Sequence, residues 1–186
     1  MSRTKYIARA GMIAAVYAAL TVLVSWLPSY LGSGLVQFRV SEALTVLAAL
    51  TPAAVPGLAL GSVLANTLSL TAVWPIALLD VVFGSLGTTL GALWTWRFRD
   101  RTWLALAGPV VCNALIVPAY LPFTFAAAGL SEVPFLNIGV GSSWLSMYAL
   151  GVLTVGIGQA VVVYTLGWGL LSALRRFVPA IDRQAG

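Results

Sequence analysis

Histidine is absent from the 186-residue sequence, and cysteine and lysine each occur once, as Cys112 and Lys5. Without histidine, neither a Ser-His-Asp nor a Cys-His catalytic arrangement can form, and the commonest proton shuttle is missing. A single cysteine excludes an intrachain disulfide and a cysteine-based metal site. Because no G-x-x-x-x-G-K-[ST] sequence surrounds the one lysine, the chain cannot hydrolyse ATP through a P-loop. We therefore expect neither enzymatic activity nor a metal or cofactor site.

Charged residues are also scarce, at 8% of a sequence that is 60% hydrophobic. A soluble domain carries about 25% charged residues, so this composition indicates an integral membrane protein. We expect one membrane domain over residues 1–186, with no room for a soluble domain. The net charge of +5 does not indicate a nucleic-acid partner, because the basic residues flank apolar stretches, where they orient the protein and contact lipid head groups.

The basic residues are sorted along the chain. Nine of the ten stand in three clusters, at residues 3–9, 97–101 and 175–183. Cytoplasmic loops collect Lys and Arg, so the three clusters should share the cytoplasmic side of the membrane. The tenth, Arg39, stands apart and precedes Glu42 by three residues. This exception is the first indication of a functional site.

The number of membrane crossings follows from this sorting. The apolar stretch at residues 40–70 is too long for one span at about 1.5 Å per residue, and Pro52 and Pro56 interrupt it. Two cytoplasmic clusters require an even number of crossings between them, so we divide the stretch in two, with Pro52 beginning the second helix. The prediction is an all-α bundle of six transmembrane helices with both termini cytoplasmic. The helices are placed near residues 7–27, 41–50, 52–69, 75–96, 103–122 and 143–174.

A small set of polar residues lies inside these predicted helices. Intramembrane polar residues are costly and usually face a bundle interior or a cavity. In the six-helix arrangement they fall mainly in the outer half, with Trp144 and Tyr148 beside them. The candidate binding residues are Arg39, Glu42, Asn66, Asp80, Asn113, Trp144, Tyr148 and Gln159. We expect them to line an outward-facing cavity with aromatic walls. The loop at residues 123–142 also faces outside, and a lid and a plain connector fit it equally well.

The same residues also fit purely structural roles. Asp80 fits an ion pair with Arg39 as well as it fits a ligand contact, and Asn66 or Asn113 alone is typical of an interhelical hydrogen bond. Convergence at one depth favours a binding site, because independent structural contacts would scatter through the bundle.

The first predicted helix carries two stripes of small residues. One consists of Ala10, Ala14 and Ala18, and the other, beside it, of Gly11, Ala15 and Ala19. Small residues at this spacing let another helix approach closely. The spacing alone fits packing inside the bundle and docking of a partner equally well.

Three segments resemble the QueT family of substrate-capturing S components of energy-coupling-factor transporters. They are Val36-Gln37-Phe38-Arg39-Val40-Ser41-Glu42, Pro52-Ala53-Ala54-Val55-Pro56-Gly57-Leu58 and Leu79-Asp80-Val81-Val82-Phe83-Gly84. The resemblance implies a bacterial plasma-membrane subunit that binds a queuosine precursor, a molecule of the 7-deazaguanine type. It also implies a transmembrane coupling protein and two cytoplasmic ATPases as partners. The chain has Gly158-Gln159 where the family often has Gly-Glu.

The available residues suit such a ligand. A carboxylate accepts the adjacent N–H and NH₂ groups of a guanine-like edge, amides read the remaining positions, and Trp or Tyr can stack on the base. The resemblance further implies that Ala10, Ala14, Ala15 and Ala18 face the coupling protein, so we expect the stripe Ala10, Ala14 and Ala18 on the outer surface. The alternative is a stand-alone proton-coupled carrier that uses Asp80 or Glu42. The small size and the lack of an internal repeat count against it.

Overall fold

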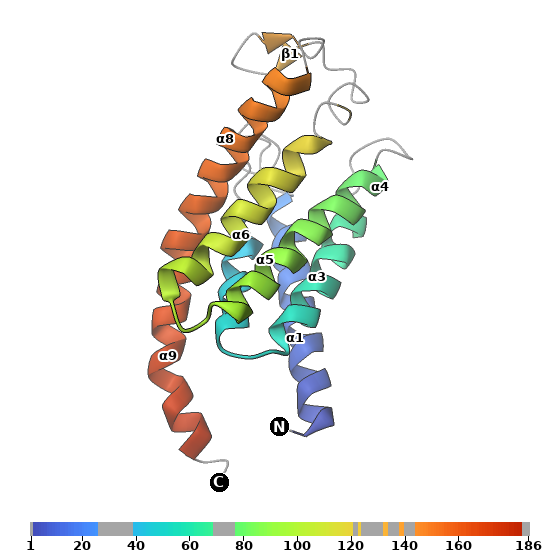
Figure 1. The fold of residues 1–186 in the computed structure, drawn as a ribbon. Coiled ribbons are helices and arrows are strands. Elements are labelled where there is room, and N and C mark those ends of the chain that lie inside the picture. The colour runs from blue at the N-terminus through green and yellow to red at the C-terminus, as the bar shows by residue number, and fades with distance from the viewer. Residues whose placement is uncertain are drawn as a thin grey trace.

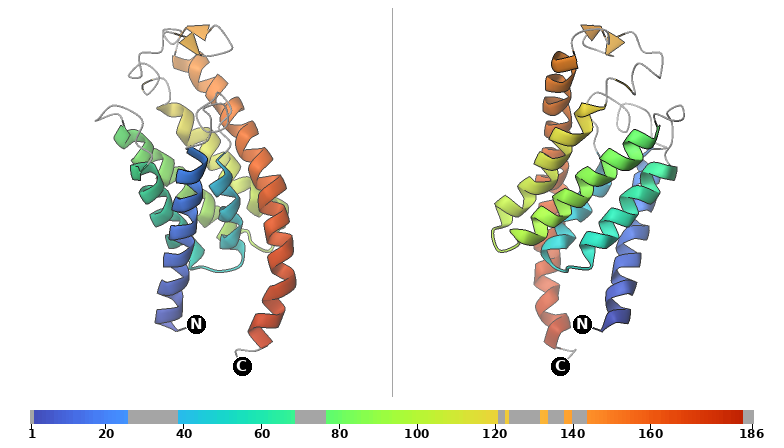
Figure 2. Two further views of the ribbon diagram at one scale, coloured as in Figure 1. Left: turned by 180° about the vertical axis from the view of Figure 1, so that it is seen from behind. Right: turned by 45° about the vertical axis from the view of Figure 1, so that its right-hand side comes forward.

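The computed structural model describes residues 2–25, 39–68, 77–120, 123, 132–133, 138–139 and 144–183. Within these ranges the chain forms a bundle of helical rods that run alternately up and down (Figure 1). Both termini lie at one end of the bundle, which Figure 2 shows from two further sides. The short strands β1 (Glu132–Val133) and β2 (Ile138–Gly139) pair antiparallel at the other end, an addition to the predicted all-α fold.

Helix α1 (Arg3–Ser25) begins four residues before its predicted start and packs along α3 (Ala54–Leu68). Two glycines on α3 allow this close approach. A Cβ atom on Gly61 would lie 2.9 Å from the Ala14 carbonyl oxygen, and one on Gly57 would lie 2.7 Å from that of Ala10. The two backbones are therefore nearly in contact, as in small-xxx-small helix pairs.

This packing corrects one prediction. Ala14 and Ala18 are buried and Ala10 is half-buried, so the stripe that we expected on the outer surface faces α3 instead. The neighbouring stripe points outward, with Gly11, Ala15 and Ala19 exposed and no atom within 4 Å of a Cβ built on Gly11. The physical reason is that Gly57 and Gly61 complement the alanines of one stripe only.

The apolar stretch after Arg39 is divided in two, as predicted. Its first part, η1 (Val40–Ala49), is a 3₁₀ helix, and α3 follows after a turn. Pro52 lies in that turn, two residues before α3 begins, rather than at the first helical position. A 3₁₀ helix rises about 2.0 Å per residue against about 1.5 Å for an α-helix, so this short segment reaches further than its length suggests.

The other elements form three further rods. The fourth consists of α4 (Ala77–Leu79), the π-helical turn η2 (Asp80–Gly84) and α5 (Ser85–Arg97). The fifth consists of α6 (Thr102–Ile116) and the 3₁₀ turn η3 (Val117–Ala119). The sixth consists of α8 (Trp144–Val162), the π-helical turn η4 (Val163–Gly167) and α9 (Trp168–Arg183), and it extends nine residues past its predicted end at residue 174. Most of the predicted loop at 123–142 lies outside the described residues.

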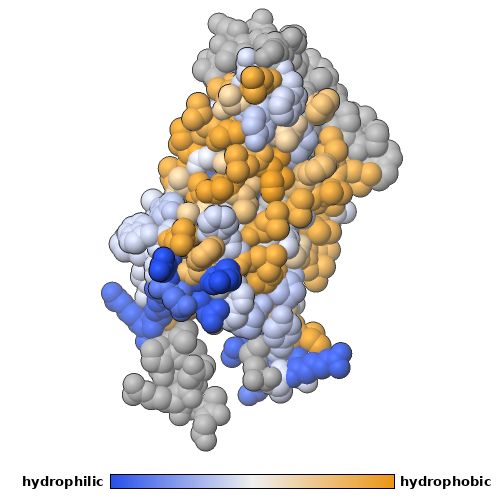
Figure 3. All heavy atoms as spheres, viewed as in Figure 1, coloured by the Kyte–Doolittle hydropathy of each residue, from blue (hydrophilic) through white to orange (hydrophobic). Residues whose placement is uncertain are grey.

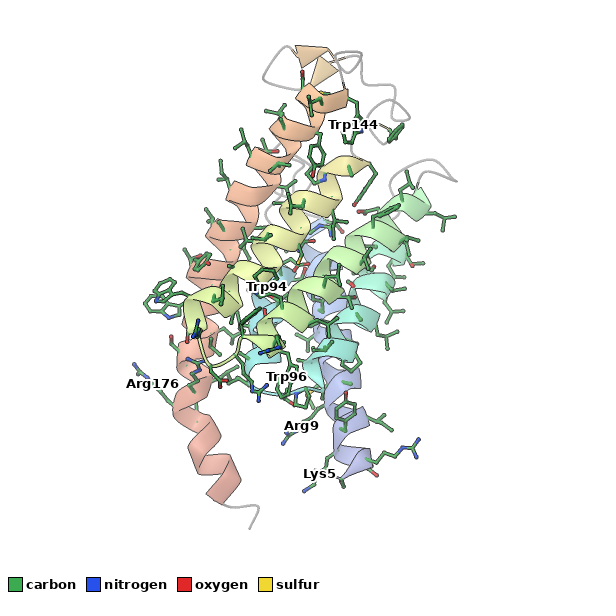
Figure 4. All side chains as sticks on the ribbon, viewed as in Figure 1. Lys5, Arg9, Trp94, Trp96, Trp144 and Arg176 are labelled. Atoms are coloured by element: carbon green, nitrogen blue, oxygen red, sulfur yellow. The ribbon has the colours of Figure 1, made fainter. Side chains whose placement is uncertain are left out.

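The surface and the helix lengths identify a multi-pass membrane protein. Among the described residues, three helices are long and apolar enough to span a membrane: Arg3–Ser25, Thr102–Ala119 and Trp144–Phe177. Apolar side chains cover the middle of the face in Figure 3, and basic side chains gather towards the end that carries the termini. Figure 4 shows Lys5, Arg9 and Arg176 at that end and Trp144 near the other. The count of six crossings and the cytoplasmic side remain predictions.

Candidate functional site

Glu42 occupies the centre of a buried polar cluster. Its side chain is fully enclosed, at 0% exposure. The hydroxyls of Tyr17 on α1 and Thr88 on α5 donate to Oε1 at 2.5 and 2.6 Å. Asn113 Nδ2 on α6 approaches Oε2 at 3.4 Å and donates to the Pro109 carbonyl at 3.0 Å. These residues, the Glu42 cluster, join four separate elements around one carboxylate.

The two oxygens of Glu42 are unequally occupied. Oε1 accepts two short hydrogen bonds, whereas Oε2 has only the long contact from Asn113 among the described residues. An ionised carboxylate offers about four acceptor positions. Oε2 therefore keeps capacity for a further donor.

A second cluster surrounds Asp80 at the end of the bundle opposite the termini. Arg39 Nη2 lies 3.1 Å from Asp80 Oδ1, which also accepts a hydrogen bond of 2.6 Å from the Tyr120 hydroxyl. Asn66 Nδ2 donates to the Asp80 carbonyl oxygen at 3.0 Å and to Ser85 Oγ at 3.2 Å. The Asp80 cluster thus ties η1, α3, η2 and the end of η3 together.

The turn that carries Asp80 leaves space for the polar side chains of the Asp80 cluster. Residues 80–84 form a π-helical turn, a feature that occurs frequently at functional sites. A Cβ atom on Gly84 would lie 2.9 Å from Asn66 Nδ2 and 3.1 Å from Asp80 Oδ1. Glycine at this position therefore leaves room for polar side chains from two other elements.

Two buried carbonyl oxygens lack a partner in the described part of the chain. They are Asn113 Oδ1 and Gln159 Oε1, in side chains that are 0% and 2% exposed. Asn113 Oδ1 lies against Gly87, where a Cβ atom would be only 2.7 Å away. Gln159 lies on the buried face of α8, four residues from Val155 and from Val163. An unsatisfied buried acceptor costs about 1–3 kcal/mol, which a donor from a ligand or water can offset.

The two predicted aromatic residues lie further out. The rings of Trp144 and Tyr148 stack with their centroids 5.0 Å apart, and Trp144 is 48% exposed. Trp144 Nε1 donates to the Ala119 carbonyl at 3.3 Å, and the Tyr148 hydroxyl donates to that of Leu115 at 3.0 Å. These bonds hold α8 against the end of α6, so the structure gives both side chains a packing role. Their contact with a ligand remains a prediction.

Three site residues were missed by the sequence analysis: Tyr17, Thr88 and Tyr120. All three are buried, and each donates to one of the two carboxylates. Tyrosine and threonine are common in membrane helices, so their presence alone gave no signal. Tyr17 stands three residues after Ala14, on the side of α1 that faces α3, but that side was predicted to face outward, so its position gave no signal either.

The charges of the site do not cancel. Arg39 contributes one positive charge, and Glu42 and Asp80 contribute two negative charges when ionised, so the described residues of both clusters carry a net charge of −1. Asp80 has the arginine as its direct partner, whereas Glu42 has only neutral donors. Burying a charge without an opposite partner is expensive. The arrangement therefore favours a cation or a strong N–H donor near Glu42.

Comparison with known proteins gave one match. The family model described as QueT transporter matches residues 7–176, which is most of the chain. No curated protein and no solved structure matches the chain. No group of three or more Cys, Asp or Glu side chains that would hold a metal ion occurs in the described ranges.

Proposed function

The chain belongs to the QueT transporter family, so it is a membrane transport protein and not an enzyme, and from this premise we propose that it is the substrate-binding S component of an energy-coupling-factor importer. In this proposal it captures a queuosine precursor of the 7-deazaguanine type from outside the cell. The observation that carries the proposal is the buried Glu42, which four elements enclose and which keeps acceptor capacity on Oε2.

Glu42 is suited to the guanine-like edge of the ligand. Tyr17 and Thr88 fix one carboxylate oxygen, so the direction of the other is set before a ligand arrives. Fixing a binding group in advance reduces the entropy lost on binding. The adjacent N–H and NH₂ groups of a deazaguanine would donate to the carboxylate, and charged hydrogen bonds are roughly twice as strong as neutral ones.

The net negative charge supports the same class of ligand. An aminomethyl ammonium on the deazapurine would offset the uncompensated charge of Glu42. The oxygens of Asn113 and Gln159 lack donors in the described residues and would accept further N–H groups. Arg39, Asn66 and Asp80 would form the outer part of the site, where the ion pair holds η1 against η2.

The partners in the proposal are a transmembrane coupling protein and two cytoplasmic ATPases. The chain has no P-loop, so energy from ATP would have to come from other subunits. Among the predicted docking residues, Ala15 is exposed, and it forms with Gly11 and Ala19 a stripe that a partner helix can approach closely. We assign the docking role to this outward stripe, in place of Ala10, Ala14 and Ala18.

Binding calorimetry on the purified chain tests the proposal. A 7-deazaguanine carrying a 7-aminomethyl or 7-cyano group should bind without any ATPase subunit, whereas adenine, with its different donor pattern, should not. Binding of none of the deazaguanines would refute the substrate assignment. The stand-alone proton-coupled carrier makes a different prediction, namely that the purified chain alone, in vesicles, accumulates the ligand when a pH gradient is imposed.

A further inference from the structure

An aromatic platform lies at the basic end of the bundle, far from the Glu42 cluster. The ring of Trp103, at the start of α6, stacks on Tyr164 with the centroids 5.7 Å apart. The Trp168 ring also contacts Trp103, with the two ring centroids 5.7 Å apart. The Tyr164 hydroxyl also donates to the Trp103 carbonyl at 3.1 Å. Trp103 and Trp168 remain 63% and 47% exposed, so the platform has fixed rings with open faces.

Arginine side chains border this platform. Arg175 Nη1 donates to Thr102 Oγ1 at 2.8 Å, and Nη2 lies 3.5 Å from the Arg99 carbonyl oxygen. These contacts hold the guanidinium at Thr102, the residue before Trp103, while Arg175 remains exposed. Arg101 is exposed as well, and its side chain makes no hydrogen bond or ion pair within the described ranges.

The turn between α5 and α6 adds a hollow of about 270 Å³ that is lined by Arg97, Phe98, Asp100 and Arg101. Five exposed arginines lie on or near this turn and on α9: Arg97, Arg99, Arg101, Arg175 and Arg176. Asp100 is the carboxylate among them, and the described residues form no ion pair here. The surface is therefore strongly cationic, with five arginines against one aspartate among these described side chains.

The apolar surface continues directly from the rings. Ile157 and Val161 are exposed and precede Tyr164 and Trp168 at helical spacing on one face of the sixth rod. From the basic turn towards the middle of the bundle, the order along this face is arginine, aromatic ring and aliphatic side chain. A phospholipid has the same order, with phosphate, glycerol and acyl chain.

We propose that Arg101, Arg175 and the Trp103–Tyr164–Trp168 platform bind one anionic phospholipid, with its phosphate on the arginines and its glycerol and upper acyl chain on the rings. Arg binds phosphate strongly because its planar N–H groups match the phosphate oxygens. Trp and Tyr prefer the depth of the head groups, where one side is apolar and the other is wet. Here three contacting rings and a tethered arginine form one surface.

Native mass spectrometry of the delipidated full chain tests this site. Phosphatidylglycerol should bind in preference to phosphatidylcholine with the same acyl chains. Arg175→Gln and Arg101→Gln should each weaken phosphatidylglycerol binding about fivefold, as expected for one basic residue near an anionic lipid. Arg101→Gln guards against misfolding, because that side chain has no partner to lose. Trp168→Leu should weaken binding too, since the ring carries the glycerol and acyl region.

The matched control is Arg9→Gln, an exposed arginine at the same end on α1, which should leave binding unchanged. An equal loss in this control would show attraction by net charge only and would overturn the proposal. Unchanged binding in both Arg175→Gln and Arg101→Gln would also overturn it. Complete displacement of the lipid by inorganic phosphate would identify a free-anion site instead. If Arg175→Gln and Arg101→Gln lose binding of the coupling protein but keep phosphatidylglycerol binding, the surface is a protein contact and the proposal is overturned.

Discussion

Tyr17 donates a hydrogen bond of 2.5 Å to Glu42 and so joins the middle of α1 to the first turn of η1. The same residue lies against Gly61 on α3, where a Cβ atom would be 3.0 Å from the Tyr17 Cβ. The close packing of α1 on α3 therefore fixes the direction of the Tyr17 hydroxyl, and through it one oxygen of the carboxylate. A structural contact and a proposed binding group are coupled by one side chain.

Removing the Tyr17 hydroxyl should destabilise the Glu42 cluster. Tyr17→Phe leaves Glu42 Oε1 with Thr88 as its short donor, and a hydrogen bond to a charged group contributes about 1.5–3 kcal/mol. We expect a lower thermal unfolding temperature in detergent and weaker ligand binding. Tyr6→Phe is the control, because Tyr6 lies on the same helix and its hydroxyl makes no hydrogen bond to the described residues. Equal stability of both variants would show that the Tyr17 bond contributes nothing.

The contact between α1 and α3 should be sensitive to a single methyl group. Gly61→Ala would place Cβ 2.9 Å from the Ala14 carbonyl oxygen, and overpacking of this kind costs about 1–3 kcal/mol. We expect a lower unfolding temperature for this variant. Gly11→Ala meets no atom within 4 Å and removes a helix glycine, so it should preserve or raise the unfolding temperature. A fall of the same size in both variants would argue against the close-packing account.

The two stripes on α1 predict opposite phenotypes. Ala15→Trp, on the exposed stripe, should abolish uptake by cells that contain the coupling protein and the ATPases, while the purified variant still binds ligand. Ala14→Trp, on the buried stripe, should instead disrupt folding, since Ala14 is 2% exposed against α3. Normal uptake by Ala15→Trp would mean that a partner docks elsewhere.

The choice between these stripes was beyond the sequence of α1 alone. Neighbouring stripes are separated by about 100° around a helix, and both of these consist of small residues. The deciding feature lies on another element, where Gly57 and Gly61 stand four residues apart and admit Ala10 and Ala14. The spacing of Gly57 and Gly61 is readable from the sequence, but it fits either stripe, so the structure was needed to identify the face.

Other features followed more directly from the residues. The proline-interrupted stretch after Arg39 divides into two helices, since Pro52 and Pro56 disfavour one continuous helix and instead lie in the turn and in the first turn of α3. The ion pair of Arg39 with Asp80, one of two roles considered for these residues, is present. The 3₁₀ form of η1 and the π-helical turn at Asp80 were not predictable, because both depend on tertiary packing rather than local preference.

Membrane orientation can be tested independently of any ligand. In a Cys112→Ser background, Arg99→Cys should react with a membrane-impermeant thiol reagent only after the cytoplasmic side is opened, because Arg99 lies in a basic turn. Phe123 is 56% exposed, and its N–H donates to the carbonyl of Tyr120, a member of the Asp80 cluster, so Phe123→Cys should react in intact cells. The reverse pattern would invert the predicted topology, and labelling of both positions from one side would exclude the six-crossing arrangement.

The most direct measurement is calorimetric titration of Glu42→Gln with the deazaguanine that binds the wild-type chain best, with Asp80→Asn titrated alongside. Loss of one partner of a desolvated charged hydrogen bond costs about 2–5 kcal/mol. Because Glu42 is buried among neutral donors and Asp80 is already paired with Arg39, Glu42→Gln should lose most of the affinity while the protein still inserts into the membrane. Wild-type affinity of Glu42→Gln would contradict the account, and wild-type affinity in both variants would mean that both carboxylates are structural.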